Sequence, residues 1–247
     1  MSRTLCLAIT LALTVSSAAP RAILIRHDRA DQQYRALGAR FPAVSSFGRA
    51  GAGTLIEPDW VLTAAHVVAG MQPGVTIPFG DVRYSIGRIV LHPEWKDGGA
   101  RDIALVKLTT PVAGVSPMAI YTRSDEAGQA IIFVGNGGTG TGLTGPQRPE
   151  DGVKRGATNV VDSADADWLH FTFDAPPAGT ELEGISGPGD SGGPAILERD
   201  GSAYVIGVSV FGRPGTIGRG TYGAKEGYTR VSTHAEWIQK TTRNAEY

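Results

Sequence analysis

The apolar residues of this 247-residue chain are gathered in short runs, and Gly, Pro, Asp or Asn bounds each run. Runs of this length that are rich in Val, Ile and Thr and flanked by turn residues are typical of β-strands in a barrel or sandwich. We therefore expect an all-β fold. The expected strands span residues 53–56, 60–63, 84–91, 103–108, 131–135, 194–197, 204–211 and 228–231.

Helical patterns are few. One short helix is predicted over residues 29–37, ending at Gly38, because glycine often follows the last turn of a helix. A second helix is predicted near the C-terminus, where Thr233 and Glu236 have the spacing of a capping box and precede an apolar pair. The outline is a series of strands followed by a terminal helix.

The charge balance limits the partners of the chain. It has 23 Lys and Arg residues against 24 Asp and Glu residues, which gives a formal net charge of -1. Nucleic acids and anionic membranes are captured by a basic excess on one face, so we expect no nucleic-acid partner. The glycine-rich segment 135–145 lacks the Gly-Lys-Ser/Thr ending of a phosphate-binding loop and is interpreted as a structural turn.

The first nineteen residues have the layout of a secretory signal peptide. A single charge at Arg3 precedes an apolar run over residues 5–15 and an end of small residues. The run is shorter than the roughly 20 apolar residues that a membrane-spanning helix needs. We expect residues 1–19 to be removed and the chain to be secreted, to the extracellular space or a bacterial periplasm, without a membrane anchor.

The only cysteine, Cys6, lies inside this predicted signal peptide. The mature chain would therefore contain no disulfide and no thiolate metal site. An exported chain of this kind must be stabilised by its core alone, which is more typical of bacterial exported proteins than of small secreted animal domains.

Residues 187–196 read GPGDSGGPAI and place glycines and prolines around Ser191. Three interpretations are open: a surface turn, an anion-binding loop, or a strained loop that presents Ser191 as a nucleophile. A serine hydroxyl is a poor nucleophile at neutral pH, so the third needs an imidazole to take its proton and a carboxylate to orient that imidazole. His66, after one expected strand, and Asp102, directly before another, are the candidates.

Three motifs occur in order, LTAAH at 62–66, DIALVKL at 102–108 and GDSGGP at 189–194. Together they resemble the chymotrypsin-like, trypsin-fold serine peptidases, and GAGTLI, LHPEW, GVSVFG and YTRV extend the resemblance over residues 42–240. It implies two six-stranded antiparallel β-barrels packed side by side, with a C-terminal helix. The implied units are an N-terminal segment at 20–41, a first barrel at 42–121, a second barrel at 122–231, and a helix and tail at 232–247.

The resemblance also implies roles for residues of the site. Ser191 would be the nucleophile, His66 the general base and then the general acid, and Asp102 the residue that orients His66. The backbone amides of Gly189 and Ser191 would form the oxyanion hole.

A substrate pocket is implied at Ile185, Phe211, Gly212 and Glu226. Ile185 stands where members that cleave after Arg or Lys have an aspartate, Phe211 replaces a tryptophan, and Gly212 would keep the pocket open. Two interpretations of Glu226 stay open. In the first, Glu226 points into the pocket, where its charge would select basic residues or help to admit both basic and aromatic ones. In the second, Glu226 is a solvated charge in a loop.

The chain also departs from the family pattern. Gly51, Val67 and Gly187 occupy positions where animal members have disulfide cysteines, so packing must brace the site. Asp190 is present, but the N-terminal Ile-Val-Gly-Gly sequence that pairs with it in many members is absent.

The resulting expectation is a monomeric, secreted serine endopeptidase that hydrolyses protein or peptide substrates through an acyl-enzyme, without a metal or cofactor. One alternative is a catalytically silent, protease-like binding module, although such modules usually lose a triad residue. The other is an esterase, because residues 189–193 fit Gly-x-Ser-x-Gly. An α/β-hydrolase would place its histidine last, and only His234 follows Ser191.

Overall fold

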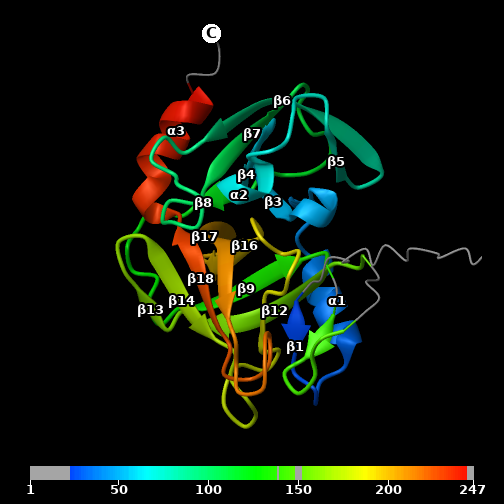
Figure 1. Ribbon diagram of the computed structural model, residues 1–247. Coiled ribbons are helices and arrows are strands. Elements are labelled where there is room, and N and C mark those ends of the chain that lie inside the picture. The colour runs from blue at the N-terminus through cyan, green and yellow to red at the C-terminus, as the bar shows by residue number, and fades with distance from the viewer. Residues whose placement is uncertain (1–22, 138, 148–151, 244–247) are drawn as a thin grey trace, which may run out of the picture.

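The computed structural model describes residues 23–137, 139–147 and 152–243, and its strands form two large sheets that lie one above the other in Figure 1. The predicted signal peptide at residues 1–19 lies outside the described residues.

The first sheet has six strands in the order β2-β3-β4-β7-β6-β5, and all its pairings are antiparallel. Apolar side chains of β4 and β7 fill its interior, and Val61, Leu62, Leu105 and Val106 are fully buried there. The strands are β2 (Val44–Ser46), β3 (Ala52–Glu57), β4 (Trp60–Thr63), β5 (Thr76–Phe79), β6 (Val82–Leu91) and β7 (Ala104–Leu108).

The second sheet has eight strands, with β12-β9-β16-β17-β18-β14-β13 in order and β8 paired with β17. Its core is aromatic, because the rings of Phe133 and Phe171 and those of Phe133 and Tyr228 pack with centroids 4.9 Å apart. The strands are β8 (Ala119–Ile120), β9 (Ala130–Gly135), β12 (Arg155–Val160), β13 (Ser163–Ala164), β14 (Trp168–Thr172), β16 (Pro194–Arg199), β17 (Ser202–Arg213) and β18 (Lys225–Arg230).

A small third sheet has the order β11-β10-β1-β15. The glycine-rich segment contributes the hairpin of β10 (Gly140–Thr141) and β11 (Gly145–Pro146), which is a structural turn as predicted. The N-terminal strand β1 (Leu24–Ile25) lies between this hairpin and β15 (Gly184–Ile185).

The predicted fold class, with two barrel-like β-sheets and a C-terminal helix, is confirmed, although the second sheet has more than six strands. Every expected strand coincides with an observed one. Among the strands that the sequence did not predict, β12 has polar residues at buried positions. The Asn159 amide, for example, donates to the carbonyls of Thr172 and Gly184, each at 2.9 Å, so hydrogen bonds replace the apolar pattern.

The prediction that Gly38 ends the first helix is wrong, because α1 (Asp31–Ala39) continues past it. A β-carbon on Gly38 would lie 2.6 Å from the carbonyl carbon of Arg155. The glycine is therefore needed for close packing of α1 on β12, and not for termination.

The predicted capping box of the terminal helix is also wrong. A 3₁₀ helix, η2 (Ser232–His234), leads into α3 (Ala235–Arg243), and the Thr233 hydroxyl donates to the Arg230 carbonyl at 2.9 Å. The apolar pair after the predicted cap is Trp237 and Ile238: Ile238 is buried, and Trp237 packs partly buried against the core. The remaining helices are η1 (Gly48–Ala50) and α2 (Ala65–Val68). Within the described ranges, no helix is both long and apolar enough to cross a membrane.

Candidate active site

The loop that carries Ser191 is held by backbone hydrogen bonds to both large sheets. The Ser191 carbonyl accepts from the Ala52 amide of β3 at 2.7 Å. On the other side, the Gly192 amide donates to the Ser209 carbonyl at 2.8 Å, and the Ser209 amide donates to the Gly193 carbonyl at 2.9 Å. Ser191 thus lies where the two sheets meet, with a partly exposed side chain.

Glycine at position 192 is required by its surroundings. Its φ of +79° is in the left-handed region, and a β-carbon would lie 2.3 Å from both the Ala52 carbonyl oxygen and Thr63 Oγ1. The absent side chain therefore leaves room for β3 and β4 of the first sheet. The same close approach involves Gly51, whose β-carbon would lie 2.3 Å from the Ser191 carbonyl oxygen.

His66 and Asp102 come together as the sequence predicted. His66 lies in α2, directly after β4, and Asp102 directly precedes β7, the strand paired with β4. Asp102 Oδ1 accepts from the His66 backbone amide at 2.9 Å, and Oδ2 lies 2.6 Å from His66 Nδ1. Because the carboxylate needs a proton on Nδ1, the neutral imidazole presents Nε2 as a proton acceptor.

Asp102 is almost fully buried, at 2 % exposure. Its carbonyl accepts from the Thr229 hydroxyl of β18 at 3.0 Å, which couples this part of the first sheet to the second. The preceding residue, Arg101, has a φ of 62°, a conformation that a non-glycine residue rarely adopts. This backbone turn places the Asp102 carboxylate against α2.

The Ser191 loop reaches the segment that carries His66. A β-carbon on Gly192 would lie 3.0 Å from the Ala64 amide nitrogen, two residues before His66. Among the hydrogen bonds of the described residues, none joins Ser191 Oγ to His66. Catalytic hydrogen bonds of this kind are often long in the free enzyme and tighten when substrate binds.

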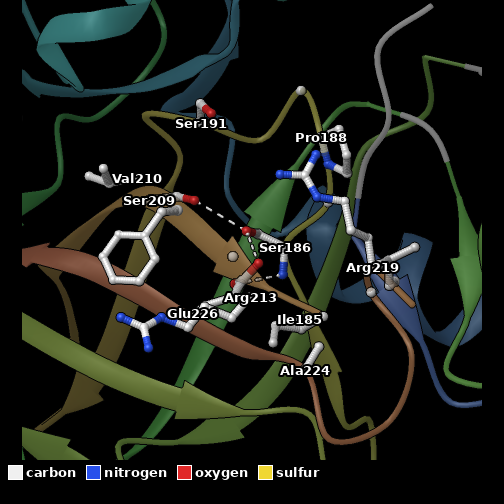
Figure 2. Close-up of a pocket in the computed structure, with 16 residues that line it drawn as sticks. Ile185, Ser186, Pro188, Ser191, Ser209, Val210, Arg213, Arg219, Ala224 and Glu226 are labelled. Atoms are coloured by element: carbon white, nitrogen blue, oxygen red, sulfur yellow. Dashed lines mark hydrogen bonds between the residues drawn. The ribbon is translucent and has the colours of Figure 1, made fainter. Parts of the chain in front are cut away.

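Beside Ser191 lies a pocket of about 350 Å³ (Figure 2). It contains the side chains of Ser186 and Glu226, and the predicted residues Ile185, Phe211 and Gly212 line it as well. All four residues that the sequence predicted for the substrate pocket therefore line it, and they belong to β15, β17 and β18.

Glu226 points into this pocket, and the alternative of a solvated loop charge is wrong. It belongs to β18, opposite Gly212 of β17, and only 6 % of it is exposed. One carboxylate oxygen accepts from the Ser186 amide at 3.0 Å and the other from the Ser186 hydroxyl at 2.6 Å. Ser186 Oγ also lies 3.1 Å from Ser209 Oγ, and Figure 2 shows this chain of side chains.

Burial raises the pKa of Glu226 to about 8, and the negative charge of Asp190 acts in the same direction, while the donors of Ser186 oppose the shift. The carboxyl is therefore neutral over most of the range below pH 8. The same burial, together with the charge of Glu226, raises the pKa of Tyr228 well above its ordinary value.

Two further predicted pocket residues are fixed by packing. The Phe211 ring packs edge-on against Trp168 with centroids 5.0 Å apart, and it lies directly over Gly227. A β-carbon on Gly212 would lie 3.6 Å from Glu226 Oε1, an ordinary contact distance, so a side chain there would extend into the pocket rather than clash with its wall.

Asp190 is also buried, at 1 % exposure. Its Oδ2 accepts from the Gly187 amide at 3.0 Å, and its Oδ1 lies so close to Gly135 that a β-carbon there would be 1.9 Å away. The expected bracing by packing is visible at Gly51 and Val67, because a β-carbon on Gly51 would lie 2.8 Å from a Val67 methyl.

Residues 31–238 match the family model described as Trypsin. The chain belongs to the trypsin family. It is 34% identical over 232 residues to a calcium-dependent serine proteinase of Mesocricetus auratus and 30% identical over 226 residues to the complement C1s subcomponent of Rattus norvegicus. It is 31% identical over 205 residues to the serine protease SP24D of Anopheles gambiae.

These three alignments cover 79%, 77% and 77% of this trypsin-family chain, and 32%, 32% and 71% of the respective relatives. The chain thus spans about a third of the length of the first two relatives. Family membership confirms the resemblance seen in the sequence.

Sequence reasoning missed several groups at the pocket of this trypsin-family chain. Ser186 follows Ile185 directly, so the positional reasoning that identified Ile185 could have found it. The exposed Arg213, on β17, and Arg219, in the loop after β17, also line the pocket. Leu24 also lines the pocket, and no local pattern could have found it, because it comes from the far N-terminal segment. Among the described residues, no group of three His, Cys, Asp or Glu side chains could hold a metal ion.

Proposed function

We propose that this chain is a serine endopeptidase that uses Ser191, His66 and Asp102 as a catalytic triad. The observation that carries the proposal is the His66–Asp102 pair, with Nδ1 2.6 Å from Oδ2, beside the loop that presents Ser191. The family match over residues 31–238 supports peptide-bond hydrolysis. Secretion of the chain is part of the proposal and depends on the signal-like residues 1–19.

In the proposed mechanism, Ser191 Oγ attacks the scissile carbonyl carbon while His66 Nε2 takes the hydroxyl proton. Asp102 holds the imidazole and stabilises its cationic form. His66 then gives the proton to the leaving amine, which departs and leaves an acyl-enzyme on Ser191. Water repeats the sequence, with His66 as base, and releases the acid.

The amides of Gly189 and Ser191 form the proposed oxyanion hole. In the described part of the chain, no hydrogen bond is donated by either amide, so both are available to a substrate oxygen. Gly189 has a φ of 100°, a conformation that disfavours any other residue. Each such donor is worth roughly 10²-fold to 10³-fold in rate at the transition state.

The proposed specificity is for basic and aromatic residues before the scissile bond, with Glu226 setting the balance. With its carboxyl protonated, the pocket offers hydroxyls and apolar walls that suit an aromatic side chain. With its carboxylate charged, the pocket attracts Arg or Lys. A bound cation would itself favour the charged form, because an opposite charge nearby lowers a carboxyl pKa.

Cleavage of a diverse peptide library, read by mass spectrometry, tests this proposal. The purified chain should cut peptides, Ser191→Ala should not, and Ser202→Ala, which changes an exposed serine of β17, should cut as the wild type does. The residues before the cut sites report the specificity. Absence of cleavage by the wild type would refute the proposal and favour a silent binding module. Equal cleavage by Ser191→Ala would refute the role of Ser191 as the nucleophile.

A further inference from the structure

The N-terminal strand β1 is an internal strand of the small third sheet. Leu24 pairs with Gly140 of the parallel neighbour β10 and with Ile185 of the antiparallel neighbour β15. The flanking residue Ile23 is 1% exposed and Leu24 is 0% exposed. A segment far from the pocket in sequence is thus built into its wall.

The Leu24 side chain reaches the pocket itself. It is one of the lining residues, and it forms a buried apolar cluster that also contains Ile185 and Ala224. A β-carbon on Gly220 would lie 2.0 Å from Leu24 Cδ1, so leucine occupies space that no side chain at position 220 could share. Leu24 therefore packs in the pocket wall between β15 and the loop at Gly220.

Hydrogen bonds hold this segment against the loops around the pocket. The Gly142 amide donates to the Ile25 carbonyl at 3.0 Å, and His27 Nδ1 lies 2.8 Å from the Tyr222 hydroxyl. The buried Arg26 guanidinium donates to the Thr180 carbonyl at 2.9 Å. The segment thus contacts the β10–β11 hairpin, the turn before β15 and the loop after β17.

Helix α1, which follows β1 in the chain, adds further contacts that hold the segment. Asp31, its first residue, accepts from the buried Arg155 guanidinium of β12 at 2.9 Å. The Tyr34 hydroxyl, fully buried, donates to the Glu183 carbonyl just before β15 at 3.1 Å. Leu24 therefore has a defined position in the pocket wall, held by its strand pairings and by these contacts on the C-terminal side of β1.

We propose that Leu24 is a specificity-determining residue that limits the depth of the substrate pocket, so that the N-terminal segment selects the size of the apolar or aromatic side chain that the pocket accepts. This inference rests on the proposed peptidase function. Shortening the leucine removes apolar atoms from the pocket wall and does not alter Ser191, His66 or Asp102. A pocket that loses or gains one methylene-sized group changes discrimination by about 10-fold or more.

The test compares Leu24→Ala and the milder Leu24→Val with the wild type on peptide amides that carry Ala, Leu, Phe or Trp before the scissile bond. The ratio of kcat/KM for Trp over Leu should rise about 10-fold in Leu24→Ala and less in Leu24→Val. Leu143→Ala is the matched control, because Leu143 is an exposed leucine of the adjacent hairpin, and its ratio should equal that of the wild type. An unchanged ratio in both Leu24 variants would overturn the inference.

Two further measurements keep the inference separate from the proposed function. The rate of labelling by a small alkyl fluorophosphonate reports Ser191 without filling the pocket, and it should be similar in the wild type and Leu24→Val. If the wild type neither labels nor hydrolyses, the peptidase proposal fails, but phenol and indole binding still tests the pocket. Leu24→Ala should then bind indole more tightly relative to phenol than the wild type does, and equal ratios would overturn the role of Leu24.

Discussion

Two buried carboxylates of the candidate site, Asp102 and Glu226, have different partners. Asp102, from the first sheet, accepts from the backbone amide and the imidazole of His66. Glu226, from the second sheet, accepts from the backbone amide and the hydroxyl of Ser186. An imidazole can become a cation, whereas a serine hydroxyl stays neutral, so the partner of Asp102 can carry a compensating charge and Ser186 cannot.

This difference indicates that the partner, more than burial, decides what a buried carboxylate can do. Asp102 accepts from the backbone amide and faces Nδ1 of His66, an arrangement that suits it to orient the imidazole in the proposed triad. Glu226 accepts its hydrogen bonds from the neutral Ser186, and its pKa is raised to about 8. It is suited to change charge near neutral pH and thereby to alter what the pocket binds.

Replacing each carboxylate by its amide should give the largest difference in kcat between the two positions. Asp102→Asn should lower kcat roughly 10⁴-fold, because the amide favours the wrong imidazole tautomer. Glu226→Gln keeps a neutral group in the pocket and should leave kcat for an aromatic substrate within about 10-fold of the wild type. Steady-state kinetics at pH 7 checks both. Comparable losses in the two variants would break the comparison.

The Ser191 loop, which lies between the two sheets, should lose activity when Gly192 is substituted. Gly192→Ala should lower kcat/KM about 10²-fold, because the new methyl group clashes with Ala52 and displaces Ser191. Gly201→Ala is the matched control, since Gly201 has a similar φ of 74° and its β-carbon would meet no described atom within 4 Å. Equal activity of the two variants would show that the contact of position 192 with β3 does not set the position of Ser191.

The selectivity for basic over apolar substrates should depend on pH through the charge of Glu226. As pH rises from 7 to 9, the carboxyl loses its proton, so kcat/KM for Arg or Lys substrates should rise relative to Phe or Leu substrates by up to about 10-fold. The ratio should be flat in Glu226→Gln, and Glu226→Ala should lower it relative to the wild type. Glu57→Gln, at an exposed position, should retain the wild-type profile. A flat wild-type ratio would remove Glu226 from the specificity proposal.

A buried histidine away from the pocket should affect stability and leave selectivity unchanged. Burial lowers the pKa of His234 to about 4, and the nearby His92 and Arg101 act in the same direction, against the opposing charge of Asp167. The unfolded chain, with an ordinary histidine pKa near 6.5, then binds more protons, so the free energy of unfolding should fall as pH falls from 6.5 to 4. The free energy of unfolding, measured by urea unfolding at several pH values, should depend less steeply on pH in His234→Phe than in the wild type. An equal dependence on pH in both would assign the acid sensitivity to other groups.

The sequence was sufficient to predict features that depend on local patterns. The strand runs and the burial of Ile238 follow from apolar spacing, whereas the pairing of His66 with Asp102 follows from the family resemblance that the ordered motifs carry. The failures have a common cause in tertiary contacts. Gly38 lies within a helix because β12 approaches it closely, Thr233 donates to a carbonyl in place of a cap, and β12 is held by polar side chains whose hydrogen-bond partners are distant in sequence.

The pocket shows the same limit. Glu226 was identified by position, but its environment depends on Ser186 and on burial between β17 and β18, which no local pattern reveals. Leu24 is the extreme case, since only the pairing of β1 with β15 brings it to the pocket. Long-range strand pairing therefore determines a part of the pocket lining that a motif search leaves open.

The most direct test of the central claim is reaction of the chain with a fluorophosphonate followed by mass spectrometry of the adduct. The Ser191 oxygen should form the bond to phosphorus, fluoride should leave, and His66 should take the serine proton. We expect one adduct, at Ser191, that forms far more slowly in His66→Ala and not at all in Ser191→Ala. An adduct at another residue, or labelling at the same rate without His66, would contradict the proposed triad.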